Sequence, residues 1–398
     1  MDFEIITDKF HKIILRKYKL CKIKPKNQTL RNLLCYYQAL ACQKYPTEDV
    51  FNIFQQEAYD MRYTVSVSTI GTYSALTYTL QAVDPRYIDD EAYTYSFLEE
   101  AFKICMEPVI VKDNFDLKTF RHAKEIYSSN LLYQEENDAR LAKAAAIHTF
   151  FKGTIRDFQP DGDLKSLERI TCKQLYRYYL TVVEEEEASC AVGNVLHQYR
   201  IENHATITPK YNHFFRKRGD YPAYVYNPKE TGQTYLEIIY DTKIFPNHKL
   251  FYAVSFLNFI FGGCSNSKLF TLVREKYGLC YSISSTHFGA SGIILVSAIL
   301  DYKDKDRAIQ AVDEAFDTLL DEVNIADIKA YFLSEKKGRA DYLLSYLNDD
   351  FMDRYFMDSV PSGKEEELLN RITPADMKAA YRKMKKALVY VYGGEKLG

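Results

Sequence analysis

The chain lacks the features that mark several large classes of protein. It contains no tryptophan, its 52 basic and 54 acidic side chains nearly cancel, and none of its eight cysteines forms a Cys-x-x-Cys pair. A dedicated nucleic-acid-binding protein would carry a strong basic excess, so this class is not indicated. Scattered cysteines are typical of reduced structural thiols, so neither a disulfide framework nor a redox motif is expected.

Long hydrophobic runs are also missing. The most apolar stretch, residues 253–261, is interrupted by serine and asparagine and is far shorter than the roughly 20 residues of a membrane span. Near the N-terminus, charged residues interrupt the apolar ones every two or three positions, unlike the apolar core of a secretory signal peptide. We therefore expect a cytoplasmic protein that associates with neither membranes nor nucleic acids.

Hydrophobic periodicity predicts helices and strands in the first half of the chain. Residues 29–44 and 48–59 carry apolar side chains at helical spacing, and Val50 falls on the side of the second helix that we expect to be buried. Residues 63–68 and 72–83 alternate between apolar and polar side chains. This alternation predicts an antiparallel hairpin.

Two segments near the ends of the two halves resemble each other. Residues 170–195 and 372–394 both open with Ile-Thr and continue as an amphipathic helix, a short turn and an apolar strand. The openings lie about 200 residues apart, roughly one domain length, which indicates an internal duplication. A long helical pattern at 117–151, which the polar segment 133–138 interrupts, precedes the first copy.

The duplication predicts two homologous domains. We assign residues 1–197 to the first domain and residues 225–398 to the second, with a polar, irregular linker at 198–224 that contains the basic cluster 216–218. In each half, strands precede helices. The predicted fold class is therefore α+β, with an antiparallel sheet covered on one face by helices in each domain.

The stretch 262–285 holds the candidate site. Its spacing predicts a short helix that ends at Gly278, with this glycine in a left-handed conformation. A strand is expected to follow directly. Alternation along that strand predicts that Tyr281, Ile283 and Ser285 share one face.

Arg274 and Tyr281 stand seven positions apart on the two sides of this turn. A guanidinium and a phenol could converge there on a common ligand. The plain alternative is a surface arginine near a helix C-terminus together with a half-buried strand tyrosine, and spacing alone does not decide between the two.

A family resemblance appears in the same stretch. Residues 267–285 read SKLFTLVREKYGLCYSISS. This run resembles the C-terminal half of the insulinase/pitrilysin family of zinc peptidases, in which Leu-Phe, Arg-Glu-Lys and Gly-Leu-x-Tyr-Ser occur in this order. The resemblance implies that Arg274 and Tyr281 contact bound peptide near the scissile carbonyl.

The metal motif of active family members is missing. They carry His-x-x-Glu-His on a helix of the first domain, where two histidines bind zinc and the glutamate activates water. Alignment with the helix at 29–44 places Asn32, Cys35 and Tyr36 at these positions, and Asn130 in place of the third ligand, a glutamate. The eight histidines include no pair at a spacing of three to five residues. We expect no zinc or other cofactor in this chain.

The resemblance implies a non-catalytic subunit of a heterodimeric bacterial zinc metallopeptidase. A partner subunit with His-x-x-Glu-His would supply the zinc, and this chain would close the chamber and bind the peptide substrate through Arg274 and Tyr281. We do not expect the chain to hydrolyse peptides alone, and the isolated chain could form a homodimer. The alternatives are a degenerate structural protein and a peptide-binding or maturation protein, both with this fold and without a proteolytic role.

Overall fold

The computed structural model describes residues 2–6, 10–193, 212–321, 325–339, 342–356 and 365–394. They form two compact units. The first comprises Met1–Tyr133 and Gln159–Thr208, and the second comprises Gln134–Phe158 and Pro209–Gly398.

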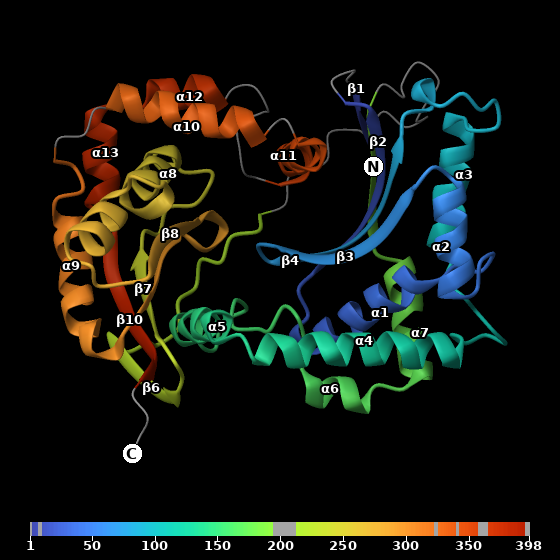
Figure 1. Ribbon diagram of the computed structural model, residues 1–398, viewed down its shortest axis with the longest axis horizontal. Helices are drawn as coiled ribbons and strands as arrows, with labels where there is room; N and C mark the ends of the chain where they lie inside the picture. Colours follow the sequence, from blue (N-terminus) through green and yellow to red (C-terminus); the bar gives the residue numbers. More distant parts are fainter. Residues whose placement is uncertain are drawn as a thin grey trace. The chain divides into compact units, whose positions relative to one another are not determined.

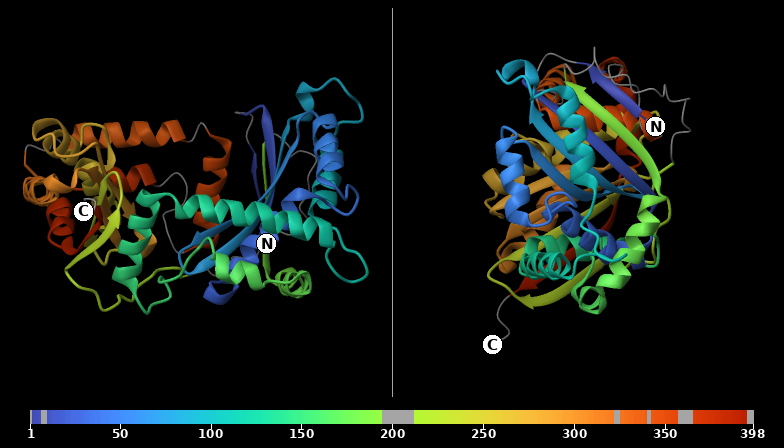
Figure 2. Two further views of the ribbon diagram at one scale, coloured as in Figure 1. Left: turned by 60° about the horizontal axis from the view of Figure 1, so that its bottom comes forward. Right: turned by 90° about the vertical axis from the view of Figure 1, so that its right-hand side faces the viewer.

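A five-stranded sheet forms the centre of the first unit (Figure 1). Its strands are β1 (Asp2–Ile6), β5 (Glu186–Gly193), β2 (Lys12–Lys22), β4 (Tyr73–Val83) and β3 (Arg62–Ile70), in this spatial order. All neighbouring pairs are antiparallel except β1 and β5, which run parallel. Figure 2 shows β5, in green, between the two blue strands β1 and β2. The predicted hairpin is β3 and β4, which turn at Gly71 with a φ of 53°.

Helices supply the rest of the first core. They are α1 (Gln28–Leu40), α2 (Glu48–Glu57), α3 (Tyr95–Met106), α4 (Leu117–Glu135), α6 (Leu164–Arg169) and α7 (Cys172–Val183). Leu33, Leu34 and Tyr37 of α1 are fully buried in the hydrophobic core, next to residues of β4 and α7. The prediction for Val50 was wrong, since its side chain on α2 is 41% exposed and only Phe51 of this helix is buried.

The second unit repeats the strand order. Its sheet runs β6 (Tyr224–Glu230), β10 (Lys385–Gly394), β7 (Thr234–Asp241), β9 (Ile293–Leu300) and β8 (Ser282–Phe288). Here too the first pair is parallel and the others are antiparallel. Its helices from the later part of the chain are α8 (Phe251–Asn258), α9 (Lys305–Asp317), α10 (Ile325–Arg339), α11 (Leu343–Tyr355), α12 (Glu365–Arg371) and α13 (Pro374–Tyr381).

The two Ile-Thr openings have the same local structure. Thr171 and Thr373 are the N-caps of α7 and α13, and each forms a reciprocal capping box with the residue three positions on. In front of each cap, a lysine from an earlier helix binds two backbone carbonyls. Lys124 binds the carbonyls of Glu168 and Ile170 at 2.9 and 3.0 Å, and Lys329 binds those of Asn370 and Ile372 at 2.9 and 2.8 Å.

One helix departs from the expected division between the halves. The predicted interruption of the long helix lies between α4 and α5 (Asp138–Phe151), where the Asn137 side chain caps α5. α5 belongs to the second unit, where it packs against β7 and β10 (Figure 1). The sheet of the second unit therefore has a helix on each face, because α8 packs on the side of Leu236 and Ile238 and α5 on the side of Glu237.

Most of the predicted linker, residues 198–211, lies outside the described residues. Residues 212–223 form neither helix nor strand and belong to the second unit, with Phe214 and Phe215 buried. The Phe215 N–H donates to the Ala290 carbonyl at 2.8 Å, and Arg218 pairs with the buried Asp241 at 2.7 Å. The described part of this segment is thus anchored on the second unit.

Glu237 should make the stability of the second unit depend on pH. The side chain is 3% exposed and accepts a hydrogen bond from the Ser297 hydroxyl at 2.6 Å. Burial raises the pKa of Glu237 from 4.5 to about 7, and the Ser297 hydroxyl and the Lys143 charge oppose that rise. The folded state therefore binds the Glu237 proton more tightly than the unfolded state does. The resulting contribution to the free energy of unfolding is complete below pH 4.5 and is lost as the pH rises through 7.

We predict that Glu237→Gln raises the free energy of unfolding by about 1–3 kcal/mol at pH 8 and changes it little at pH 5, because the amide removes the buried charge. Urea unfolding at the two pH values measures this. Glu275→Gln, which neutralises an exposed carboxylate of the same unit, is the control. Equal effects of Glu237→Gln at both pH values would show that its carboxyl is not held protonated.

Candidate functional site

The helix face that would carry a zinc motif belongs to α1. One side of α1 packs into the core through Leu33, Leu34 and Tyr37. Asn32, Cys35 and Tyr36, which are only partly buried, lie at i, i+3 and i+4 on the remaining surface, so the predicted common face exists.

Residues 160–163 cover part of this face. The Asn32 amide donates to the Pro160 carbonyl at 2.9 Å and to the Gln28 carbonyl of its own helix at 2.9 Å. The Tyr127 hydroxyl donates to the Asp161 carbonyl. A Cβ atom at Gly162, whose φ is 77°, would lie 2.9 Å from the Thr29 Cα, so this position requires glycine in both conformation and space.

The other predicted positions are also hydrogen-bonded. The Asn130 amide donates to the Tyr36 hydroxyl at 2.9 Å, and the Tyr36 ring stacks on Tyr127 with 4.9 Å between centroids. The Cys35 thiol donates to the Val65 carbonyl at 3.1 Å. Burial raises the pKa of Cys35 to about 12, so its thiol is neutral at physiological pH.

This donor set does not fit zinc. Zinc sites use several thiolate, imidazole or carboxylate ligands, whereas this face offers one such side chain, Cys35, beside two amides and a phenol. Within the described part of the chain, no group of three or more histidine, cysteine, aspartate or glutamate side chains could hold a metal ion. We assign no step of a reaction to a metal at this face.

The second candidate region is the junction before β8. Residues Phe270–Lys276 form a π-helical turn, with Leu269 and Val273 buried on its inner side. Gly278 has a φ of 60°, as predicted for a left-handed stop, and the Leu279 N–H then donates to the Val273 carbonyl at 3.0 Å. π-helical turns often occur at functional sites, because their wider winding changes the direction of side chains.

Arg274 lies on the exposed side of this turn. Its guanidinium stands 4.9 Å from the centroid of the Phe270 ring, and it has no ion-pair partner among the residues that the structure describes. Burial raises the pKa of Cys280 to about 11, and the nearby charge of Arg274 opposes that rise. Arg274 is therefore held by a ring and offers its N–H groups to solvent.

Tyr281 is 55% exposed and directly precedes β8. Its N–H donates to the Ile299 carbonyl at 2.8 Å, and its hydroxyl donates to Asp301 at 2.9 Å. That hydrogen bond raises the pKa of Tyr281, so the phenol stays protonated. The prediction of a shared face was wrong, because Ile283 and Ser285 are buried whereas Tyr281 is exposed.

Arg274 and Tyr281 do not touch each other. No hydrogen bond or ring contact joins these two described side chains, since Arg274 rests on Phe270 and Tyr281 binds Asp301. The structure thus places both on the exposed surface of one short segment, with separate neighbours.

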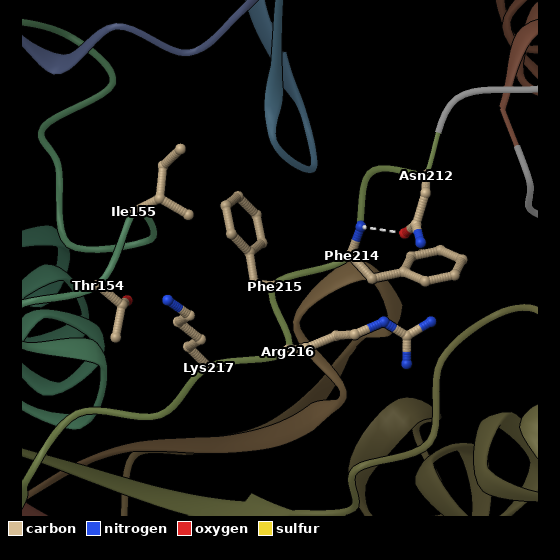
Figure 3. A pocket seen from close by; sticks show the side chains of 7 residues that line it. All are labelled: Thr154, Ile155, Asn212, Phe214, Phe215, Arg216 and Lys217. Carbon is tan, nitrogen blue, oxygen red and sulfur yellow. Dashed lines mark hydrogen bonds between the residues drawn. The ribbon is translucent and has the colours of Figure 1, made fainter.

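A cavity that we did not predict lies in the second unit (Figure 3). It has a volume of about 370 Å³ and is lined by Thr154, Ile155, Asn212, Phe214, Phe215, Arg216 and Lys217. Phe215 projects beside Ile155, while the Arg216 guanidinium points to the other side of the chain, 4.7 Å from the Phe245 ring centroid. In the sequence, the sign that this segment is packed was the pair of adjacent phenylalanines beside the basic cluster 216–218.

The middle part of the chain matches a family model. A model of the family described as "Peptidase M16 inactive domain" matches residues 185–331, a range that includes Arg274 and Tyr281. The curated protein "Probable inactive metalloprotease YmfF" from Bacillus subtilis (strain 168) is 22% identical over 341 residues, which cover 81% of this chain and 79% of that protein.

Solved structures share the fold over nearly the whole chain. A conserved protein from Enterococcus faecalis aligns with a TM-score of 0.85 and 19% identity, covering 100% of this chain and 97% of that one. A peptidase M16 inactive domain from Pseudomonas fluorescens aligns with a TM-score of 0.76 and 14% identity, covering 99% and 95%. A chain of complex III2 from Candida albicans aligns with a TM-score of 0.70 and 12% identity, covering 98% and 93%.

These comparisons confirm the resemblance to the non-catalytic proteins of the insulinase/pitrilysin family and the α+β fold. They support an inactive, metalloprotease-like protein. In the described residues, no helix combines the length and the apolar character that crossing a membrane would need.

The hydrogen bond between Asn130 and Tyr36 is directly testable. We predict that a double-mutant cycle of Tyr36→Phe and Asn130→Ala gives a coupling energy of about 0.5–1.5 kcal/mol, because each single change removes the same hydrogen bond. Urea unfolding of the four proteins measures it. The control cycle combines Tyr36→Phe with Lys118→Ala, which alters an exposed side chain on the same helix as Asn130. Additive effects of Tyr36→Phe and Asn130→Ala would contradict the contact.

Proposed function

We propose that this chain is the non-catalytic subunit of a heterodimeric zinc metallopeptidase. In this proposal, a second subunit carries His-x-x-Glu-His and the zinc ion. This chain completes the chamber and contacts the peptide substrate through Arg274 and Tyr281.

One observation carries the proposal. The surface segment that resembles the peptide-contacting part of the family keeps an exposed guanidinium and an exposed, protonated phenol. On the α1 face, the positions that align with the metal ligands hold hydrogen-bonded amides, a thiol and a phenol. Loss of the metal site together with retention of the peptide-contact residues favours a division of labour between two chains.

The chemistry assigned to this chain is hydrogen-bond donation. Arg274 has five N–H donors and no competing carboxylate in the described structure, so its guanidinium can bind a peptide carbonyl. Tyr281 donates to Asp301, and a substrate carbonyl would compete with that carboxylate for the phenol proton. Donors that are fixed near a developing oxyanion stabilise it more than mobile water does.

The alternative is a structural protein with the same fold. The similarity to a chain of complex III2 shows that this fold also occurs inside a multisubunit assembly. A structural role would require that this chain associates with its partners and that Arg274 and Tyr281 contribute nothing to turnover. The same variants therefore distinguish the two functions.

We predict that Arg274→Ala and Tyr281→Phe each lower kcat/KM of the reconstituted pair by about 10²- to 10³-fold without preventing its assembly, because each removes a donor to the reacting carbonyl. Peptide hydrolysis and size-exclusion chromatography measure the two properties. Lys276→Ala and Tyr277→Phe are matched controls, because they remove a cation and a hydroxyl that face Glu314. Full turnover by both test variants in an intact pair would favour the structural alternative.

A further inference from the structure

A second cavity opens on the first unit, away from the α1 face. It has a volume of about 250 Å³ and lies between the C-terminal end of α2 and the segment that leads into α3. Four aromatic side chains line it: Phe54, Tyr59, Tyr93 and Phe97. No residue of the proposed peptide-contact segment or of the degenerate zinc face takes part.

The aromatic rings meet at steep angles. Tyr59 and Tyr93 have centroids 4.8 Å apart and planes at 72°, and Tyr93 and Phe97 have centroids 5.8 Å apart and planes at 46°. Tyr93 is 4% exposed, and its hydroxyl donates to the Val83 carbonyl at 3.1 Å, so this ring is fixed. Rings in such contact leave no room between them, but the outward face of a ring that lines the cavity attracts a cation placed over it.

The backbone at the cavity wall is unusual. Tyr59 and Asp60 both adopt left-handed conformations, with φ of 58° and 54°, although neither is glycine. Such residues are uncommon, and they cluster where function needs a particular side-chain position. The Tyr59 hydroxyl donates to Asp90 at 2.9 Å, which holds the ring over the cavity.

The charge of this surface is strongly negative. Glu57 and Asp90 line the cavity and no lysine or arginine does. Residues 47–60 contain four acidic side chains and residues 84–91 contain four, against one basic residue, Arg86, which pairs with Asp84 at 2.8 Å. Glu57 has no ion-pair partner in the part of the chain that the structure describes, so its charge is available to a ligand.

We propose that this cavity binds the protonated side chain of a lysine or arginine from a peptide. The aromatic faces provide cation–π attraction, and Glu57 and Asp90 provide charge-assisted acceptors at the rim. The cavity thus recognises cationic residues at a place separate from Arg274 and Tyr281. The result of its test therefore does not depend on the proposed metallopeptidase role.

Calorimetric titration of the full chain with three capped tripeptides tests the proposal. The central residue is arginine, lysine or norleucine, which has a neutral chain of similar length. We expect dissociation constants on the order of 1 mM for the two cationic peptides and no saturable heat for norleucine. Raising the ionic strength from about 0.05 M to about 0.5 M should weaken the cationic peptides. Equal binding of all three peptides, or affinity that does not change with salt, would overturn the proposal.

Two variants locate the site. Glu57→Gln and Tyr59→Leu should each weaken arginine-peptide binding about two- to fivefold, by removing a rim charge and a ring face. Glu100→Gln makes the same charge change on α3 without lining the cavity and should bind as the parent does. Circular dichroism melting checks that each variant folds. Parent-like affinity in both folded test variants would show that the cavity is not the binding site.

Discussion

On one face of α1, the side chains that stand where a zinc enzyme of this family would have its metal ligands are hydrogen-bonded within the chain. Asn32 holds the carbonyl of Pro160, Asn130 holds the hydroxyl of Tyr36, and the thiol of Cys35 is bound to the carbonyl of Val65. Each polar group that stands where a ligand would be has an internal partner, so none is left to bind a metal ion. These partly exposed polar groups are therefore satisfied by partners within the chain.

The same sheet topology serves different purposes in the two units. Both place five strands in one order and begin their last helix with a capping box, with a lysine bound to the carbonyls in front of it. These shared interactions maintain the scaffold. The two units differ in their candidate sites. The first has the hydrogen-bonded α1 face, and the second has the π-helical turn with exposed Arg274 before β8. In the proposed function, the peptide contacts therefore lie on a short segment that the shared scaffold positions.

Periodicity was sufficient to predict elements whose pattern is local. The hairpin of β3 and β4 alternates clearly, and the break between α4 and α5 is visible as a polar segment before the Asn137 cap. Packing partners were not predictable in the same way. The apolar residues of α5 show that one side is buried, but not that it lies on the sheet of the second unit. Val50 was predicted to be buried from its helical spacing and is exposed, because a single apolar residue on a helix does not have to be buried.

Side-chain direction at the site was also beyond the sequence. A π-helical turn has no simple residue pattern, so the neighbours of Arg274 could not be foreseen. Tyr281 was predicted on the face of Ile283, but the chain bends before β8 and the phenol turns to Asp301. By contrast, the pairing of Tyr36 with Asn130 follows positions that alignment with the zinc motif had already singled out. Alignment thus named two positions that lie side by side, and tertiary contacts determined what each of them binds.

We propose that this chain provides a peptidase-like scaffold without a metal site of its own. The most direct measurement is the zinc content of the purified full chain after equilibrium dialysis against zinc, combined with a peptide hydrolysis assay on the same sample. We expect no stoichiometric zinc and no hydrolysis that a chelator abolishes. One tightly bound zinc ion per chain, with chelator-sensitive hydrolysis that is lost in Cys35→Ala, would contradict it.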